Sequence, residues 1–220
     1  MAIILNIDTA ISTASVCLSK EDQSLQFALN SNHQDHASWL HVAIKNVIAE
    51  AGMGVKDLEA MAVTIGPGSY TGLRVGLSTA KGLCFALGIP LICINTLEVM
   101  AYAVRNEEAN LVCPVIDARR MEVFMAVYNK NMETIVSPCA MIIEENSFNS
   151  MLVSGKIIFS GNGSEKIKKV VCHPNAIFEN STTTAADMVK LSENKFVEKK
   201  FADTAYTEPF YIKEFYSPAH

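Results

Sequence analysis

The sequence predicts a duplicated α/β fold, with two mixed sheets and flanking helices. Short apolar strand patterns alternate with segments of helical period along the 220 residues. Two stretches share one order: a buried strand ending in aspartate, a polar turn, a second strand and a hairpin. The two aspartates, Asp8 and Asp117, lie 109 positions apart, close to half the chain. A repeat of this length indicates a duplicated domain and excludes a solenoid.

The first half contains an antiparallel meander followed by helix-linked strands. The runs 2–7, 14–18 and 24–29 are typical of three strands, because apolar residues dominate them and a polar turn separates the last two. The period then changes to that of an amphipathic helix, which Gly52 is placed to end. We predict helices over 35–51, 70–87 and 97–105, and strands over 58–65 and 91–95.

The second half begins with the same pattern and then contains fewer predicted helices and strands. We predict strands over 112–116, 123–128, 134–137 and 156–160, and helices over 144–152 and 185–201. Thr184 to Asp187 matches a capping box for the last helix, and the aromatic segment 209–213 is expected to dock on the core. The pattern fits an actin-like or hexokinase-like fold. It divides into subdomains 1–108 and 109–220, with part of 185–220 packed back on the first.

Composition narrows the class of protein. The net charge is −5, and basic residues form only small clusters in the sequence. Both observations disfavour tight nucleic-acid binding by the chain alone. The six cysteines are irregularly spaced and mostly lie in apolar runs, so we expect reduced, buried thiols. The N-terminus has no basic region before its apolar run, and no apolar stretch reaches 18 residues. We expect a cytoplasmic protein without a membrane span.

The turn after the first predicted strand is a candidate nucleotide-binding turn that lacks some of the expected residues. In this fold the strand-end turns face the crevice where phosphates bind. Asp8 and Thr9 supply an acid and a hydroxyl, but the turn has no glycine and Ile11 would crowd a phosphate. Two interpretations of this turn therefore remain: a functional phosphate-binding loop, or a structural turn capped by Asp8.

The segment from Gly66 to Gly72 is the most unusual in the chain. It joins a predicted strand to a helix N-terminus, where free N–H groups favour an anion, but it lacks the P-loop ending. A tight turn with Ser69 as N-cap is the alternative. In the following helix Gly72, Gly76 and Ala80 recur on one face, which indicates close approach of another backbone. That backbone belongs either to the chain's own sheet or to another subunit.

Two other polar clusters are weaker signals. His33, His36 and His41 do not have the spacing of a helical zinc motif, so we expect no metal site. The segment 117–122 holds four charges between two apolar strands, which predicts either paired surface charges or a face for a partner.

Several segments together resemble the bacterial TsaB family, also called YeaZ. The most specific is Gly66-Pro67-Gly68-Ser69-Tyr70-Thr71-Gly72-Leu73-Arg74-Val75-Gly76. Weaker matches occur in family order at 7–10, 117–124, 161–163 and 211–213. The resemblance implies an actin/Hsp70-like fold of the ribonuclease H-like class.

The resemblance also implies a function. Members take part in forming N6-threonylcarbamoyladenosine at position 37 of transfer RNAs that read ANN codons. The implied role is that of a non-catalytic scaffold for a TsaD-like catalytic subunit, joined by a TsaE-like ATPase. Those partner subunits would use ATP and a metal ion. This chain alone would bind no cofactor. Transfer RNA would be reached only through the complex, and a homodimer would form when the partner is absent.

The family pairs with its partner through the first two helices, which gives an expected interface. The residues that we assign to it are Trp39, Leu40, Ala43, Gly72, Leu73, Gly76, Leu77, Ala80 and Leu83. Two rival functions remain. One is an ATP-dependent kinase of the same fold, which the missing glycine near Thr9 disfavours. The other is a metallopeptidase, which the missing metal-ligand spacing disfavours.

Overall fold

The structure is a computed structural model that describes residues 2–30, 36–106 and 108–213. The chain divides into two compact units, residues 1–99 with 183–210, and residues 100–182 with 211–220. The first boundary therefore falls inside a helix, α3, and not at 108/109 as the sequence suggested. The return of 183–210 to unit 1 agrees with the expected packing of the C-terminal segment.

Unit 1 is built on a five-stranded mixed sheet in the order β3-β2-β1-β4-β5. β1, β2 and β3 form the predicted antiparallel meander, while β4 and β5 continue the sheet in parallel with β1. β1 and β4 are buried along almost their whole length, because helices cover both faces of the sheet. The strands are β1 Ile3–Asp8, β2 Ala14–Lys20, β3 Gln23–Asn30, β4 Ala60–Thr64 and β5 Leu91–Ile94.

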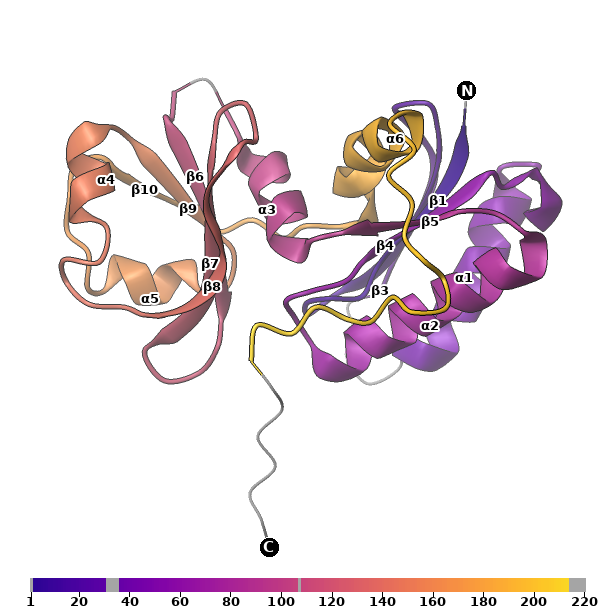
Figure 1. The fold of residues 1–220 in the computed structure, drawn as a ribbon, viewed down its shortest axis with the longest axis horizontal. Coiled ribbons are helices and arrows are strands. Elements are labelled where there is room, and N and C mark those ends of the chain that lie inside the picture. The colour runs from indigo at the N-terminus through magenta and orange to yellow at the C-terminus, as the bar shows by residue number, and fades with distance from the viewer. Residues whose placement is uncertain (1, 31–35, 107, 214–220) are drawn as a thin grey trace, which may run out of the picture. The chain divides into compact units, whose positions relative to one another are not determined.

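Helices α1 and α2 lie side by side on one face of this sheet, and α6 covers the other (Figure 1). The apolar stripe of α1, including Leu40, Ile44 and Val47, packs into a core with Leu77 and Ala80 of α2. The helices are α1 His36–Glu50, α2 Tyr70–Leu87, α3 Thr96–Val104 and α6 Val189–Val197, with 3-10 turns η1 Val55–Asp57 and η2 Ala185–Met188.

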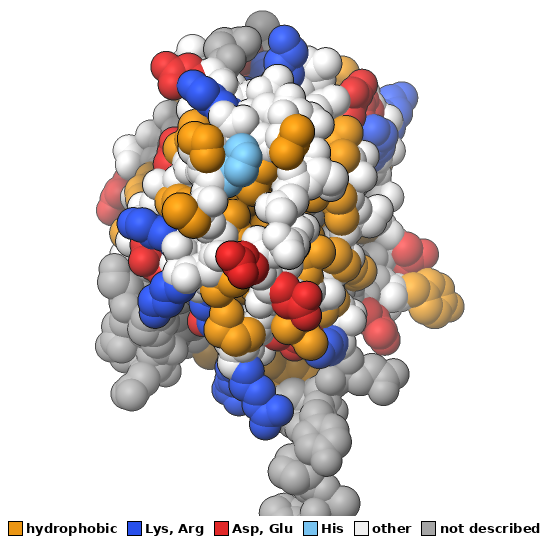
Figure 2. Space-filling model, turned by 90° about the vertical axis from the view of Figure 1, so that its left-hand side faces the viewer, with side chains coloured by type: hydrophobic (Ala, Val, Ile, Leu, Met, Phe, Trp, Pro, Cys, Tyr) orange, Lys and Arg blue, Asp and Glu red, His pale blue; other side chains and the backbone are white. Residues whose placement is uncertain are grey.

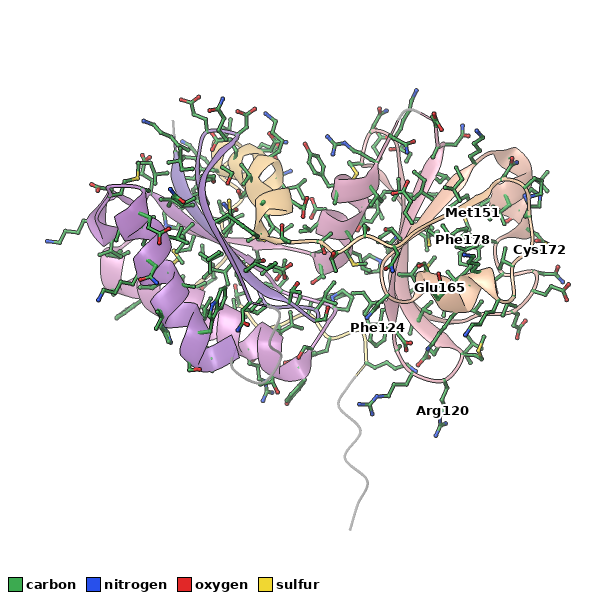
Figure 3. All side chains as sticks on the ribbon, turned by 180° about the vertical axis from the view of Figure 1, so that it is seen from behind. Arg120, Phe124, Met151, Glu165, Cys172 and Phe178 are labelled. Carbon is green, nitrogen blue, oxygen red and sulfur yellow. The ribbon has the colours of Figure 1, made fainter. Side chains whose placement is uncertain are left out.

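Unit 2 repeats the architecture with the sheet order β10-β9-β6-β7-β8. Its core centres on Phe159, whose ring contacts those of Phe148 and Phe178 (Phe178 is labelled in Figure 3). The elements are β6 Leu111–Asp117, β7 Glu122–Asn129, β8 Thr134–Ile142, β9 Ile157–Ser160, β10 Ala176–Glu179, α4 Asn149–Ser154 and α5 Ser164–Lys168.

The duplication predicted from the two aspartates is confirmed by the two strand orders, which match strand for strand. Asp8 ends β1 and Asp117 ends β6, each beside an antiparallel meander. Unit 2 differs from the prediction in three places. The strand from Thr134 is longer, the predicted helix over 144–152 starts later, and α5 and β10 are additional elements. The two additions are four or five residues long, too short for a hydrophobic period to be visible.

The chain from Ala202 to Phe210 docks on unit 1, whereas residues 211–213 of the aromatic segment that was predicted to dock belong to unit 2. Ala202 pairs with Leu91 of β5, and the Lys81 ammonium on α2 donates to the carbonyls of Ala205 and Thr207. The Phe210 amide donates to the Ile65 carbonyl over 2.7 Å. These hydrogen bonds hold 202–210 against β5, α2 and the residue that follows β4.

Two expectations from composition can be compared with the structure. Cys17, Cys84 and Cys113 are buried, and burial raises the pKa of the Cys84 thiol to about 12, but Cys172 is exposed. None of the helices in the described ranges is long and apolar enough to cross a bilayer.

Candidate functional site

The turn after β1 is buried and closed by the chain's own contacts. Asp8 Oδ1 accepts hydrogen bonds from the Ala10 amide over 3.0 Å and from the Thr64 hydroxyl over 2.7 Å. Burial raises the pKa of Asp8 to about 6, and the charge of Asp187 acts in the same direction, while the two hydrogen bonds oppose the shift. Asp8 is therefore a buried capping group and not a solvent-facing carboxylate.

The N-terminal turn of α2 fills the space beside this turn. The Ser69 amide donates to the Ala10 carbonyl over 2.7 Å, and the Thr9 hydroxyl donates to the Gly72 carbonyl over 2.7 Å. Ser69 caps α2 by accepting from the Gly72 amide, which confirms its predicted role. The Ser69 and Gly72 amides are thus already bonded, so the N-terminus of α2 has fewer N–H groups to offer an anion than the sequence suggested.

Gly68, Gly72 and Gly76 are required by the same close approach. A Cβ added at Gly68 would stand closer than 3.0 Å to the Ala10 carbonyl, and one at Gly72 equally close to the Thr9 carbonyl. A Cβ at Gly76 would meet the Thr9 hydroxyl oxygen at such a distance. The small-residue face of α2 therefore packs on β1 and β4 of its own sheet.

This packing corrects the expected partner interface. The sequence showed that a backbone must come close to Gly72 and Gly76, but not which one, because a helical stripe has the same period against a sheet or a subunit. Trp39 and Leu83 are only partly buried and remain on the border of the face. The expected interface residues that are instead buried within unit 1 are Leu40, Ala43, Gly72, Leu73, Gly76, Leu77 and Ala80.

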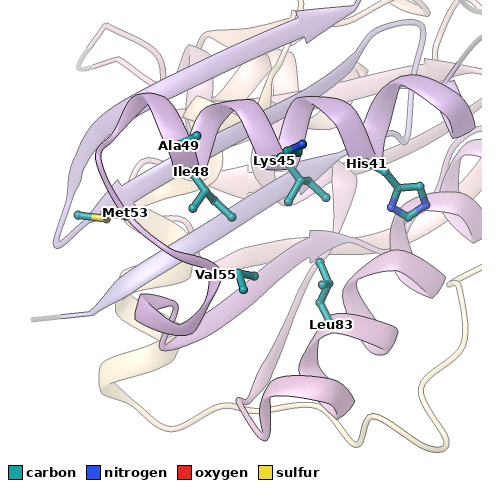
Figure 4. A pocket seen from close by; sticks show the side chains of 8 residues that line it. His41, Lys45, Ile48, Ala49, Met53, Val55 and Leu83 are labelled. Atoms are coloured by element: carbon teal, nitrogen blue, oxygen red, sulfur yellow. The ribbon is translucent and has the colours of Figure 1, made fainter.

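The outward sides of α1 and α2 form an apolar groove of about 400 Å³ (Figure 4). Its lining residues are His41, Ile44, Lys45, Ile48 and Ala49 of α1, Leu83 of α2, and Met53 and Val55 from the segment after α1. The lining is mostly apolar although the groove faces solvent, which is the composition of a surface that other molecules cover.

Two large apolar side chains stand out on the same two helices. Phe85 on α2 is 88% exposed and Val42 on α1 is 57% exposed. The sequence analysis missed both, because it selected the inward stripe of each helix. The sequence did contain a signal for them. Val42 and Phe85 are large apolar residues outside the buried faces of the two helices, to which Ala43 and Cys84 belong.

The equivalent turn in unit 2 is open and charged. Asp117 Oδ1 accepts from Lys166 Nζ over 2.6 Å and from the Arg119 amide over 2.6 Å. Partial burial tends to raise the pKa of Asp117, but the hydrogen bond and charge of Lys166 hold it below the usual value. Lys213 pairs with Glu122 over 2.5 Å. The acids of this predicted charge cluster are thus paired by lysines from distant segments.

Side chains that could ligate a metal ion are dispersed over the described parts of the chain. No group of three or more His, Cys, Asp or Glu side chains comes together there. His41 is exposed on α1, His33 lies outside the described residues, and of His36 only the backbone position is described. Over α4 and β10 of unit 2, acidic, basic and apolar side chains are interspersed on the surface (Figure 2). That face shows no basic stripe of the kind that binds nucleic acid.

The fold and the closed turn together define a class of protein. Two sheets of matching order, each with an aspartate at the end of its first strand, make this a duplicated actin/Hsp70-like domain pair. In unit 1 the strand-end turn, where such folds bind phosphate, is filled by the chain itself.

Comparisons with known proteins identify the family. Residues 30–212 match the model of the TsaD family, described as tRNA N6-adenosine threonylcarbamoyltransferase. The chain is 34% identical over 125 residues to the tRNA threonylcarbamoyladenosine biosynthesis protein TsaB of Bacillus subtilis. It is 29% identical over 189 residues to TsaB of Buchnera aphidicola, covering 79% of this chain and 89% of that one. The chain belongs to the TsaB (YeaZ) family, within the wider family that the TsaD model defines.

A solved structure extends the similarity over the whole fold. YeaZ from Pseudomonas aeruginosa superposes with a TM-score of 0.84 at 25% identity, covering 96% of this chain and 100% of that one. The sequence match is shorter: it covers 57% of this chain and spans 54% of the Bacillus subtilis relative. The fold is therefore shared end to end, while sequence similarity is strongest over about half of the chain.

Proposed function

We propose that this chain is a non-catalytic subunit of the machinery that forms N6-threonylcarbamoyladenosine at position 37 of ANN-decoding transfer RNAs. In this role it binds and supports a TsaD-like catalytic subunit in the cytoplasm. The names of the TsaB relatives support the pathway. The observation that carries the scaffold role is the contrast within unit 1: the phosphate turn is sealed, and an apolar face is left exposed.

The outward face of α1 and α2 is the surface that we assign to the partner. It comprises Val42, Phe85 and the groove lined by His41, Lys45 and Leu83. Covering a phenylalanine that is 88% exposed would contribute about 2 kcal/mol of hydrophobic free energy, because burial of a whole side chain is worth roughly 1.5–3 kcal/mol. The same face would make an isologous homodimer when the partner is absent.

The remaining parts of the proposal concern the other members of the assembly. A TsaE-like ATPase joins the complex, the partners use the ATP and the metal ion, and transfer RNA is reached through the complex. The sealed Asp8 turn argues against the kinase alternative, because Thr9 and Ala10 are already in contact with α2. The missing metal-ligand spacing in the sequence disfavours a metallopeptidase.

Co-purification with a tagged TsaD-like subunit tests the proposal. We expect Phe85→Ser and Val42→Asp each to weaken retention at least tenfold, because central apolar contacts of an interface cost more than about 1.4 kcal/mol when lost. Val197→Asp is the matched control, since Val197 is 70% exposed on α6 of the same unit. Light scattering of the chain alone tests the homodimer with the same variants. Equal retention of all three variants would contradict the assignment of this face.

Calorimetry with ATP tests the non-catalytic role separately. We expect weak or no ATP binding to the isolated chain, because neither Thr9 nor Ala10 can move without displacing α2. Micromolar binding accompanied by turnover would favour the kinase alternative.

A further inference from the structure

β3 is an outer strand of the unit 1 sheet, and one side of it exposes large apolar side chains. Leu25, Phe27 and Leu29 alternate along the strand and are 38%, 41% and 47% exposed. Successive side chains of a strand point to opposite faces of the sheet, so these three share one face. Ala28, between them, packs against the core that α1 covers. The three residues, which we call the β3 stripe, therefore lie on the opposite face from α1.

The edge of β3 lacks the features that protect the other outer strands. An outer strand exposes backbone N–H and C=O groups, and proteins block such an edge with charges, proline, shortness or a covering segment. β5 is covered by Ala202, β8 contains Pro138, and β10 has only four residues. β3 has eight residues, none of them charged and none of them proline. Among the strands that the structure describes, it is hydrogen-bonded to β2 alone.

This edge is regular over most of its length. The register shift between β2 and β3 lies between Leu18 and Ser19, near the hairpin end of the pair. From Gln26 to Asn30 the pairing with β2 runs without interruption. A regular and uncharged edge can accept a further strand, because its outward backbone groups are spaced to continue the ladder.

We propose that a second copy of this chain pairs with this edge, β3 against β3, in antiparallel orientation. Such a contact is isologous and has its two-fold axis perpendicular to the sheet. This axis preserves the faces of the sheet, so odd-numbered positions of one copy lie opposite odd-numbered positions of the other. The β3 stripe then meets itself, with Phe27 opposite either Phe27 or Leu29 of the second copy. Cross-strand apolar pairs of this kind stabilise a sheet.

Sequence symmetry and charge favour a second copy over an unrelated strand. Leucine stands on both sides of Phe27 in the β3 stripe, so its apolar pattern is the same in both directions. An antiparallel copy requires that symmetry, whereas an unrelated strand does not. The chain has a net charge of −5, but β3 adds nothing to the repulsion between copies. Asp22, in the adjoining turn, is paired with Lys190 over 3.1 Å.

The contact is expected to be weak and separate from the surface assigned to the TsaD-like partner. One strand from each copy buries less than the roughly 1,200 Å² at which standard interfaces begin. We therefore expect the dimer to become populated at roughly 0.1–1 mM chain. The outward face of α1 and α2 lies on the other side of the sheet, so both contacts can form at once.

Sedimentation velocity of the full chain, from about 10 μM to 1 mM, tests the proposal. The chain carries Val42→Asp and Phe85→Ser throughout, which removes the apolar contacts of the α1 and α2 face. Any self-association that remains is then independent of that face. Circular dichroism checks that this background is folded.

The test variant adds Phe27→Lys and Leu29→Lys to this background. The matched control adds Ile135→Lys and Ile142→Lys, which replace two exposed apolar residues on β8, an outer strand of unit 2. We expect self-association to weaken at least tenfold in the β3 variant, because like charges then stand opposite each other, and to be unchanged in the control.

Two further measurements identify the pairing itself. A chain with Phe27→Glu and Leu29→Glu, mixed with the lysine variant, should restore association, because opposite charges then face each other. With β3 unaltered, hydrogen exchange at residues 26–30 should slow as the chain concentration rises, since new backbone hydrogen bonds protect these amides. This second measurement does not depend on the folding of any β3 variant.

Several results would overturn the proposal. They are monomeric behaviour at about 1 mM, an equal loss in the β8 control, and exchange at residues 26–30 that does not change with concentration. Binding of a synthetic peptide of residues 23–30 without self-association of the chain would assign the edge to a strand of another protein. A failure to bind a TsaD-like subunit would leave this result unaffected.

Discussion

Gly76 is the residue at which the close packing of α2 can be tested. Gly76→Leu should destabilise the chain by roughly 3 kcal/mol, because its Cβ would collide with the Thr9 hydroxyl and already contact Val63 and Ile7, which leaves no space for the rest of the leucine. For a chain of this size that corresponds to a fall in Tm of about 6–12 °C, measured by far-UV circular dichroism.

The matched control is Gly82→Leu on the same helix. A Cβ at Gly82 meets nothing within 4 Å, and the replacement improves helix propensity by up to about 1 kcal/mol. We expect its Tm to be unchanged or higher. If Gly76→Leu were as stable as Gly82→Leu, the packing of α2 on the Thr9 turn would be wrong.

Asp8 gives a pH-dependent prediction. Its pKa is raised to about 6 in the folded state against 3.8, so the native state binds the proton more tightly than the unfolded chain does. The stability from this group is fully present below pH 3.8 and is lost as the pH rises through about 6, by at most ~3 kcal/mol. Asp8→Asn should be the more stable protein above pH 6, because its amide oxygen still accepts from Ala10 and Thr64.

Urea unfolding from about pH 4 to pH 8 measures this effect. The gap between Asp8→Asn and the unchanged chain should open as the pH rises and level off above about 6. Glu108→Gln, at an exposed position, should show no such gap. A constant difference at every pH would show that ionisation of Asp8 is not the cause.

At the scale of elements, the capping box at the start of η2 was predicted from the sequence and is confirmed. The Thr184 hydroxyl accepts from the Ala186 amide, and the Asp187 carboxylate accepts from the Thr184 amide over 2.8 Å. Thr184→Ala should cost about 1 kcal/mol in unfolding free energy, measured by denaturant titration. Thr182→Ala, at an exposed position just before it, should have no measurable effect.

At the scale of the whole molecule, the stability of unit 1 depends on residues 183–210, which follow most of unit 2 in the sequence. The Ala185 amide donates to the Ser15 hydroxyl on β2, and α6 packs against β1 and β5. A chain that ends at Thr182 should therefore lose amide protection in unit 1, while the Phe159 core of unit 2 stays protected. Hydrogen exchange measures both units in one experiment. Uniform loss, or none, would contradict this division.

The sequence by itself determined what depends on neighbours along the chain. The strand–aspartate–hairpin pattern predicted the duplication, Ser69 and Thr184 predicted their caps, and the spacing of Leu40 and Ile44 predicted the buried face of α1. These are local effects of side-chain period and backbone hydrogen bonding.

Only the tertiary structure decided which surfaces meet. The stripe of Gly72 and Gly76 required a close backbone, and packing against Thr9, more than sixty residues earlier, made that backbone the chain's own. Pairing of Asp117 with Lys166, 49 residues apart, likewise joins two segments that are distant in the sequence. Contacts between distant segments depend on how the two sheets assemble, and no local period encodes them.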